Sequence, residues 1–198
     1  MKNFDQMTII MVSYNSSEKI MRILNNINKK FKVIVIENSQ DKKLKKKIIN
    51  LRPNTKVYLP KKNKGFGAGL NYGIKNTNSK FIFRLDTDDT TNPERIINQL
   101  TYMESKLIDI SAGYMEDQNG KLLKYPLNFF EMGLMMAIGT NPIAHPSVCI
   151  RRESLYLSYN ENLSRCEDFD LWIRYFLNGA YNIKVFKKPI TKYNTQRS

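Results

Sequence analysis

The chain is poor in cysteine, in long apolar runs and in acidic side chains. Two cysteines, Cys149 and Cys166, cannot build the disulfide framework of a small secreted protein, so we expect a reducing, cytoplasmic compartment. The longest weakly polar stretch, residues 133–143, falls well short of the ~20 residues that a membrane-spanning helix requires. No basic leader followed by an apolar core opens the chain, and we therefore expect no cleaved signal peptide.

The shortage of acidic residues leaves a strongly basic chain. There are 32 Lys and Arg against 18 Asp and Glu, a net charge of +14, with lysine blocks at residues 42–47 and 61–64. Such a surface can bind nucleic acid, anionic lipid or phosphorylated ligands, or it can be a solvated helix face. Because the signatures of nucleic-acid modules are missing, we expect no nucleic-acid partner. We favour peripheral contact with the inner face of the cell membrane, aided by the apolar residues 129–138.

The organisation of the chain predicts one α/β domain over residues 1–198. No low-complexity linker or internal repeat divides it, and its hydrophobic content of 41% is ordinary for a globular protein. Strand-like segments alternate with helical ones in the first half, at residues 8–13, 32–37, 55–59 and 81–85. Repeated units of this kind predict a mostly parallel central sheet flanked by helices.

Three carboxylates follow the fourth of these strands, at Asp86, Asp88 and Asp89. A strand that ends in clustered acids puts anionic oxygens at the sheet edge where open α/β folds bind ligands. Like charges this close repel unless a cation lies between them, and hard oxygen ligands suit Mg²⁺ or Mn²⁺. The alternative is that these residues form a turn and cap the helix that begins near Pro93.

Two further segments can contribute to a site. The glycines of residues 64–71 let backbone amides approach a phosphate at a helix N-terminus, although Leu70 stands where a dinucleotide fingerprint needs its third glycine. Apolar residues recur at helical spacing in residues 166–175, so Asp168 falls in a first helical turn and can project into a cleft above the sheet. Helix packing and capping account for these segments equally well.

In this order the segments resemble the family 2 glycosyltransferases of GT-A fold, from Thr8 to about Phe186. The resemblance rests on six motifs: Val12-Ser13-Tyr14-Asn15, Ile36-Glu37-Asn38-Ser39, Asn63-Lys64-Gly65, Asp86-Thr87-Asp88, His145-Pro146-Ser147-Val148, and Glu167-Asp168 followed by Asp170-Leu171-Trp172. It implies a donor half at about residues 1–92 and an acceptor half at about residues 105–198. It also implies inverting, metal-dependent transfer of a sugar from a nucleotide-sugar donor to a hydroxyl group, in cell-surface polysaccharide or lipopolysaccharide biosynthesis.

The resemblance also implies a role for individual residues. Asp168 is the expected catalytic base, and Asp88 and Asp89 are expected at a divalent metal, Mn²⁺ or Mg²⁺. The residues expected to bind the nucleotide-sugar, a UDP-sugar, are Ser13, Tyr14, Glu37, Asn38, Lys64, Gly65, Asn71, Asp86 and Asp88. Those expected on the acceptor side, facing a glycan or lipid-linked acceptor, are His145, Glu167, Asp170 and Trp172.

Two other functions stay open at this point. A sugar nucleotidyltransferase would share the sheet and the metal carboxylates, but it would open with a phosphate loop rich in glycine and arginine, which residues 11–15 do not offer. A non-catalytic polyanion-binding protein would account for the net charge of +14 and would leave Asp168 and the aspartates at residues 86–89 without a purpose.

Overall fold

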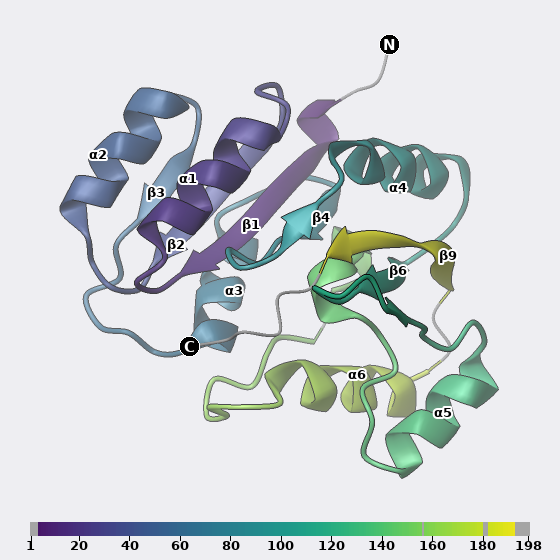
Figure 1. Ribbon diagram of the computed structural model, residues 1–198. Coiled ribbons are helices and arrows are strands. Elements are labelled where there is room, and N and C mark those ends of the chain that lie inside the picture. The colour runs from purple at the N-terminus through teal and green to yellow at the C-terminus, as the bar shows by residue number, and fades with distance from the viewer. Residues whose placement is uncertain (1–3, 156, 180–181, 193–198) are drawn as a thin grey trace.

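A computed structural model describes residues 4–155, 157–179 and 182–192 (Figure 1). The strands are β1 (Met7–Ser13), β2 (Lys32–Glu37), β3 (Lys56–Tyr58), β4 (Phe81–Arg84), β5 (Thr90–Thr91), β6 (Ile110–Glu116), β7 (Leu122–Leu123), β8 (Cys149–Arg151) and β9 (Ile183–Lys192). The helices are α1 (Ser17–Asn26), α2 (Lys42–Leu51), α3 (Phe66–Lys75), α4 (Pro93–Ser105), α5 (Phe129–Ala137) and α6 (Glu167–Leu177). Short 3₁₀ turns are η1 (Phe4–Gln6), η2 (His145–Ser147) and η3 (Arg152–Ser154).

The strands form one sheet in the order β3-β2-β1-β4-β8-β6-β9-β5, with β7 added beside β6. Among strands β1 to β4 every pairing is parallel: β1 pairs with β2 and β4, and β2 pairs with β3. In the second half β8 runs antiparallel between β4 and β6, and β9 runs parallel to β6. The predicted α/β fold with a mostly parallel sheet flanked by helices is confirmed.

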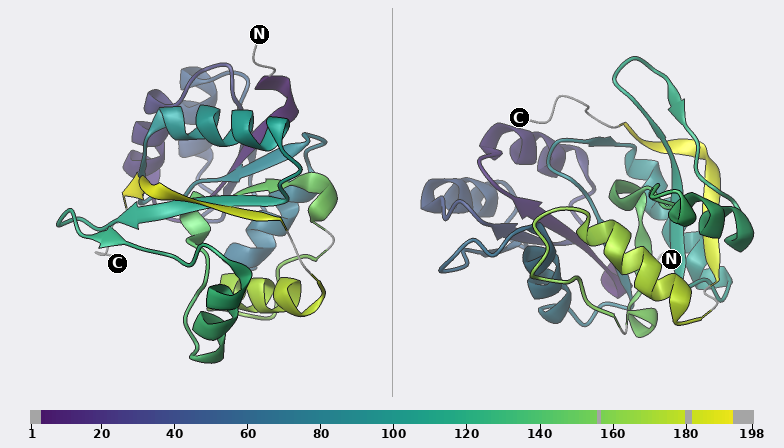
Figure 2. Two further views of the ribbon diagram at one scale, coloured as in Figure 1. Left: turned by 90° about the vertical axis from the view of Figure 1, so that its right-hand side faces the viewer. Right: turned by 90° about the horizontal axis from the view of Figure 1, so that it is seen from below.

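Helices cover both faces of the sheet, which explains why β1 is buried throughout and mostly apolar. Successive strand residues point to opposite faces, so alternate residues of β1 belong to different cores. Ile9 and Met11 lie in a core with residues of α1, α2 and α4, whereas Ile10 and Val12 lie in a core with residues of α3 and α6. Figure 2 shows these two layers on either side of the sheet. Among the described helices none has both the length and the apolar character needed to cross a bilayer.

Helix α3 packs unusually close to the sheet, and its glycines allow that approach. A Cβ atom on Gly73 would lie 2.6 Å from Cγ2 of Ile10, and one on Gly69 would lie 3.0 Å from both γ-methyl groups of Val12. Close packing therefore accounts for these two glycines. The N-cap residue Gly65 differs, because its φ of +94° is strained for other residues and no atom crowds the position of its missing Cβ.

The last strand is longer than the sequence predicts. The apolar pattern predicts a strand over residues 182–186, whereas β9 extends from Ile183 to Lys192. It continues because it pairs with β6 along that length, with register shifts on either side of Tyr114, and then meets β5. The charged end of β9 thus owes its conformation to strands far away in the chain.

Candidate functional site

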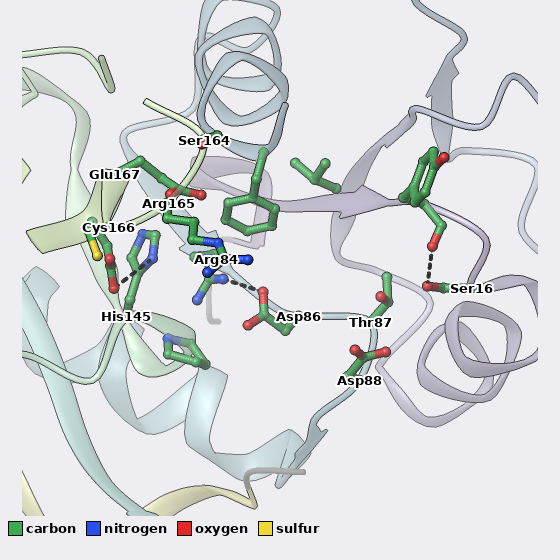
Figure 3. A pocket seen from close by; sticks show the side chains of 15 residues that line it. Ser16, Arg84, Asp86, Thr87, Asp88, His145, Ser164, Arg165, Cys166 and Glu167 are labelled. Carbon is green, nitrogen blue, oxygen red and sulfur yellow. Dashed lines mark hydrogen bonds and ion pairs between the residues drawn. The ribbon is translucent and has the colours of Figure 1, made fainter. Parts of the chain in front are cut away.

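A cavity of about 500 Å³ opens where β1 and β4 end and α6 begins (Figure 3). It lies beyond the carboxyl ends of the parallel strands, where open α/β sheets bind ligands. Its walls come from five separate parts of the chain. They are lined by Val12, Tyr14, Ser16, Phe66, Arg84, Asp86, Thr87, Asp88, His145, Pro146, Ser164, Arg165, Cys166, Glu167 and Asp168. The cavity thus brings together six of the predicted site residues: Tyr14, Asp86, Asp88, His145, Glu167 and Asp168.

Asp86 forms an ion pair with Arg84, the last residue of β4. Both side chains are nearly buried, and the Arg84 guanidinium lies 4.8 Å from the centroid of the Phe66 ring. Nε and Nη1 of Arg84 have no hydrogen-bond partner among the described residues. No role is predicted for Arg84 from the sequence, although a cationic residue in the run Phe81-Ile82-Phe83-Arg84-Leu85 is a usable signal.

Asp88 faces a cation from another element. Its Oδ1 lies 3.0 Å from Nζ of Lys19 on α1, and Oδ1 has no exposed surface. Asp89 is buried beside it. Among the described residues, no three His, Cys, Asp or Glu side chains converge as a protein-only metal cage.

The carboxylates nevertheless fit a metal of the expected kind. Mg²⁺ in nucleotide sites is held by one or two carboxylates together with substrate phosphates, and it seldom occupies a cage made by protein alone. Asp88 offers a hard anionic oxygen on the cavity wall, and the structure already places a positive charge against it. The donor set therefore suits a divalent cation that arrives with a diphosphate.

Asp168 lies in the first turn of α6 and is held from several directions. Its Oδ1 accepts the backbone N–H of Phe169 at 2.9 Å, and its Oδ2 accepts a hydrogen bond from Nδ2 of Asn141 at 2.6 Å. Nδ1 of His145 lies 3.7 Å from the same Oδ2. A carboxylate at this end of a helix is also favoured by the helix dipole.

His145 is enclosed in a wall of rings. Its Nε2 lies 2.7 Å from the hydroxyl oxygen of Tyr159, and its ring meets Trp172 and Phe66 edge to face. Burial raises the pKa of Tyr159 well above its ordinary value, so this hydroxyl keeps its proton at neutral pH. Trp172 is buried behind His145 and supports it from the core.

Several predicted site residues lie outside this cavity. Ser13 is buried, and Glu37 is also buried, where its Oε1 accepts the backbone N–H of Ser39 at 2.8 Å. Asp170 pairs with Arg174 at 2.6 Å. Four others line a second cavity of about 560 Å³ beside the first: Asn38, Lys64, Gly65 and Asn71.

Asn71 fastens α3 to the loop that carries Tyr159. Its Nδ2 donates to the backbone oxygen of Tyr159, and its Oδ1 accepts the backbone N–H of the same residue, both at 2.9 Å. Neither this contact nor that of Asn141 has a signal in the sequence, because each partner comes from a distant segment. The structure therefore adds Lys19, Arg84, Asn141 and Tyr159 to the candidate residues.

Comparison with known proteins connects this site to one family. Residues 8–188 match glycosyl transferase family 2. An uncharacterised glycosyltransferase of Methanocaldococcus jannaschii is 31% identical over 202 aligned residues, which cover 94% of this chain and 69% of that protein. The amylovoran biosynthesis glycosyltransferase AmsE of Erwinia amylovora is 36% identical over 132 residues, 63% of this chain and 48% of that protein.

Solved structures share the fold. The crystal structure of S. aureus TarS in complex with UDP-GlcNAc superposes with a TM-score of 0.77 at 23% identity, covering 98% of this chain and 59% of that one. The mannosyltransferase PcManGT of Pyrobaculum calidifontis, in complex with GDP-Man and Mn²⁺, gives a TM-score of 0.68 at 12% identity and covers 95% and 56% of the two chains. The present chain thus spans little more than half of either structure, and at these identities the likeness concerns the fold alone.

Proposed function

Because this chain belongs to glycosyl transferase family 2, we propose that it transfers a sugar from a nucleotide-sugar donor to a hydroxyl acceptor, with a divalent metal and with inversion. One observation supports this most. A single cavity gathers the carboxylates that follow β4, which suit a metal diphosphate, and a further carboxylate at the start of α6, which suits a base. Residues distant in the chain thereby surround one space of a size that fits a small-molecule ligand.

On the donor side, Asp88 would hold Mn²⁺ or Mg²⁺ with Asp89 behind it. When bound, the metal would neutralise the negative charge that develops on the departing diphosphate. Asp86, oriented by Arg84, would accept a hydrogen bond from a sugar hydroxyl. The neighbouring TarS and PcManGT structures contain UDP-GlcNAc and GDP-Man respectively, and we propose a UDP-sugar for this chain.

The nucleoside is assigned to the region between the two cavities. Tyr14 lines the first cavity, while Asn38, Lys64 and Gly65 line the second. Nδ2 of Asn38 donates to the backbone oxygen of Gly65 at 3.3 Å, which connects the end of β2 to the N-cap of α3 at the second cavity. Ser13 and Glu37 are buried and would contribute by shaping the ends of β1 and β2. Asn71 would contribute by holding the loop of Tyr159 against α3.

On the acceptor side, Asp168 would accept the proton of the attacking hydroxyl. That oxygen forms a bond to the anomeric carbon while the bond to the diphosphate breaks, and the electron pair leaves with the nucleoside diphosphate. Attack opposite the leaving group inverts the anomeric configuration. Glu167 lines the same wall, whereas Asp170 and Trp172 would contribute by holding α6 in place.

These assignments follow the two proposed halves, since residues 1–92 supply the donor wall and residues 105–198 supply the acceptor wall. The name of the relative AmsE supports a glycan or lipid-linked acceptor in polysaccharide biosynthesis. The family match also argues against the sugar nucleotidyltransferase and the non-catalytic polyanion-binding protein that the sequence left open.

A cytoplasmic location with peripheral membrane contact stays part of the proposal. The structure separates the two features behind it: the lysine-rich α2 and the apolar α5 lie at opposite ends of the molecule in Figures 1 and 2. On α5 and just after it, Phe130, Leu134 and Ile138 are exposed. The two features therefore do not form one contiguous patch, and each end needs its own test.

The direct test is a panel of nucleotide sugars assayed for release of nucleoside diphosphate with Mn²⁺, with Mg²⁺ and with EDTA. We expect metal-dependent turnover of one UDP-sugar, lowered by ~10² or more in Asp168→Asn and retained in the surface control Glu104→Gln. Binding of UDP and Mn²⁺ to the folded protein should raise its melting temperature by mass action. If an oligonucleotide raised it and UDP with Mn²⁺ did not, the polyanion-binding alternative would replace the proposal.

A further inference from the structure

The contacts around Asp168 involve Asn141 and Tyr159, to which no role has been assigned, and His145, which is expected only to lie on the acceptor side. Resting on the proposed function of Asp168 as base, we propose that Asn141 and His145 are positioning residues. They orient the Asp168 carboxylate toward the acceptor hydroxyl. Tyr159 in turn holds His145 in the protonation form whose Nδ1–H faces that carboxylate. Both donors converge on one oxygen, Oδ2, from segments outside α6.

Asn141 supplies the shorter contact, with its Nδ2 at 2.6 Å from Oδ2 of Asp168. The amide orientation follows from charge, because a flipped side chain would press its oxygen against a carboxylate oxygen. With the nitrogen toward Asp168, Oδ1 of Asn141 faces the backbone N–H of Ile143 at 3.5 Å. The amide group therefore satisfies both neighbours in only one orientation.

The proton on His145 can be placed from its second neighbour. Nε2 lies 2.7 Å from the Tyr159 hydroxyl, and burial keeps that hydroxyl protonated at neutral pH by raising the pKa of Tyr159. A neutral ring with its hydrogen on Nε2 would turn the Nδ1 lone pair toward the Asp168 carboxylate, so the favoured neutral form carries its hydrogen on Nδ1 and accepts from Tyr159; a charged ring carries a hydrogen on both nitrogens. In either case Nδ1–H faces Oδ2 of Asp168, at 3.7 Å. Such contacts often shorten only when substrate is bound.

The arrangement leaves Asp168 with few orientations. Oδ1 accepts the N–H of Phe169, and Oδ2 faces Asn141 and His145. Edge-to-face contacts of His145 with Trp172 and Phe66 keep the imidazole from turning away. A general base must lie within hydrogen-bond reach of the proton it removes, so small misplacements lower the rate without weakening donor binding.

A double-mutant cycle tests this inference. We expect Asn141→Ala and His145→Gln each to lower kcat by ~10- to 100-fold, the scale of a misplaced general base, with the affinity for UDP and Mn²⁺ unchanged. His145→Asn should recover part of the loss, because its amide nitrogen stands near the position of Nδ1, and Tyr159→Phe should cause a smaller loss. Asn162→Ala, on an exposed loop residue, is the control and should be fully active.

In the Asp168→Asn background, Asn141→Ala and His145→Gln should not lower kcat any further. Residues that act only through the Asp168 carboxylate have no effect once that carboxylate is removed. The role would be merely structural if the fold-losses in kcat of the single variants multiplied in the double variants. Equal losses of turnover and UDP affinity would show the same. Inactive Asp168→Asn beside fully active Asn141→Ala and His145→Gln would overturn the inference and leave the proposed base intact. Full activity of Asp168→Asn would overturn both.

Discussion

The ammonium nitrogen of Lys19 lies 3.0 Å from Oδ1 of Asp88, an oxygen that has almost no exposed surface. The pair connects α1 to the turn after β4. Its side chains are 39% and 28% exposed, so the pair is weak, worth at most ~1 kcal/mol. A divalent cation and Lys19 would compete for one carboxylate. Once released by a metal diphosphate, the same ammonium would be free to contact a phosphate oxygen.

The first prediction concerns this competition. In Lys19→Met the affinity of the nucleotide-free protein for Mn²⁺ alone should rise about two- to fivefold, which matches the strength of a half-exposed ion pair. This affinity can be measured from the electron paramagnetic resonance signal of free Mn²⁺. Lys30→Met removes an equal charge from an exposed position outside both cavities and should have a much smaller effect. Equal Mn²⁺ affinities in wild type and Lys19→Met would show that the ion pair does not compete with the metal.

The second prediction concerns the metal itself. Asp88→Asn should weaken the binding of UDP in the presence of Mn²⁺ at least ~10-fold, because the carboxylate that holds the cation is lost while the shape is kept. Calorimetric titration checks it, with Glu104→Gln as the control for a lost surface charge. Wild-type protein in EDTA should match the variant. The metal assignment fails if EDTA leaves the affinity of the wild type for UDP or GDP unchanged.

The third prediction separates three neighbouring acids. Asp168→Asn should lower turnover by ~10² or more with little change in donor affinity. Asp170→Asn should leave most activity, since Asp170 points to Arg174 and not into the cavity. Glu167→Gln should be intermediate, because Glu167 shares the cavity wall. The base would be reassigned to Asp170 if its variant alone lost transfer activity.

The fourth prediction asks which end of the molecule meets a membrane. If α5 docks, Phe130→Ser with Ile138→Ser should abolish co-sedimentation with anionic vesicles, and replacing the exposed Lys42, Lys43 and Lys46 by Gln should not. Each basic residue near an anionic surface contributes ~1 kcal/mol, so the lysine variant should dominate if α2 docks instead. All of these side chains are exposed, so the fold should survive either change. Equal binding to neutral and anionic vesicles would leave the charge as a solubility feature.

The fifth prediction concerns the close approach of α3 to β1. Gly73→Ala should lower the free energy of unfolding by ~1–3 kcal/mol, because the new Cβ would lie 2.6 Å from Ile10. In a helix without such a neighbour the same change stabilises by up to ~1 kcal/mol. Urea denaturation shows whether the free energy of unfolding falls or rises. A stabilised variant would mean that α3 lies farther from the sheet.

Local pattern was enough to predict the first four main strands, helix α6 and the family. The apolar runs at residues 8–13, 32–37, 55–59 and 81–85 and the helical spacing of residues 166–175 placed these elements within one or two residues, because burial leaves its pattern in the sequence. The six motifs predicted the family that the match over residues 8–188 establishes. The same reasoning could not find that β8 inserts antiparallel between β4 and β6, since those partners are far apart in the chain.

The sequence by itself thus determined the α/β fold and proposed Asp86, Asp88 and Asp168 as the chemical groups. Only the tertiary structure decided what each group meets: Arg84 beside Asp86, Lys19 on Asp88, and Asn141 with His145 around Asp168. It also separated α2 from α5, and it placed Asn38 and Lys64 at the second cavity instead of the first. The physical reason is that periodicity records whether a side chain is buried, whereas its partners depend on how the sheet order brings distant strand and helix ends together.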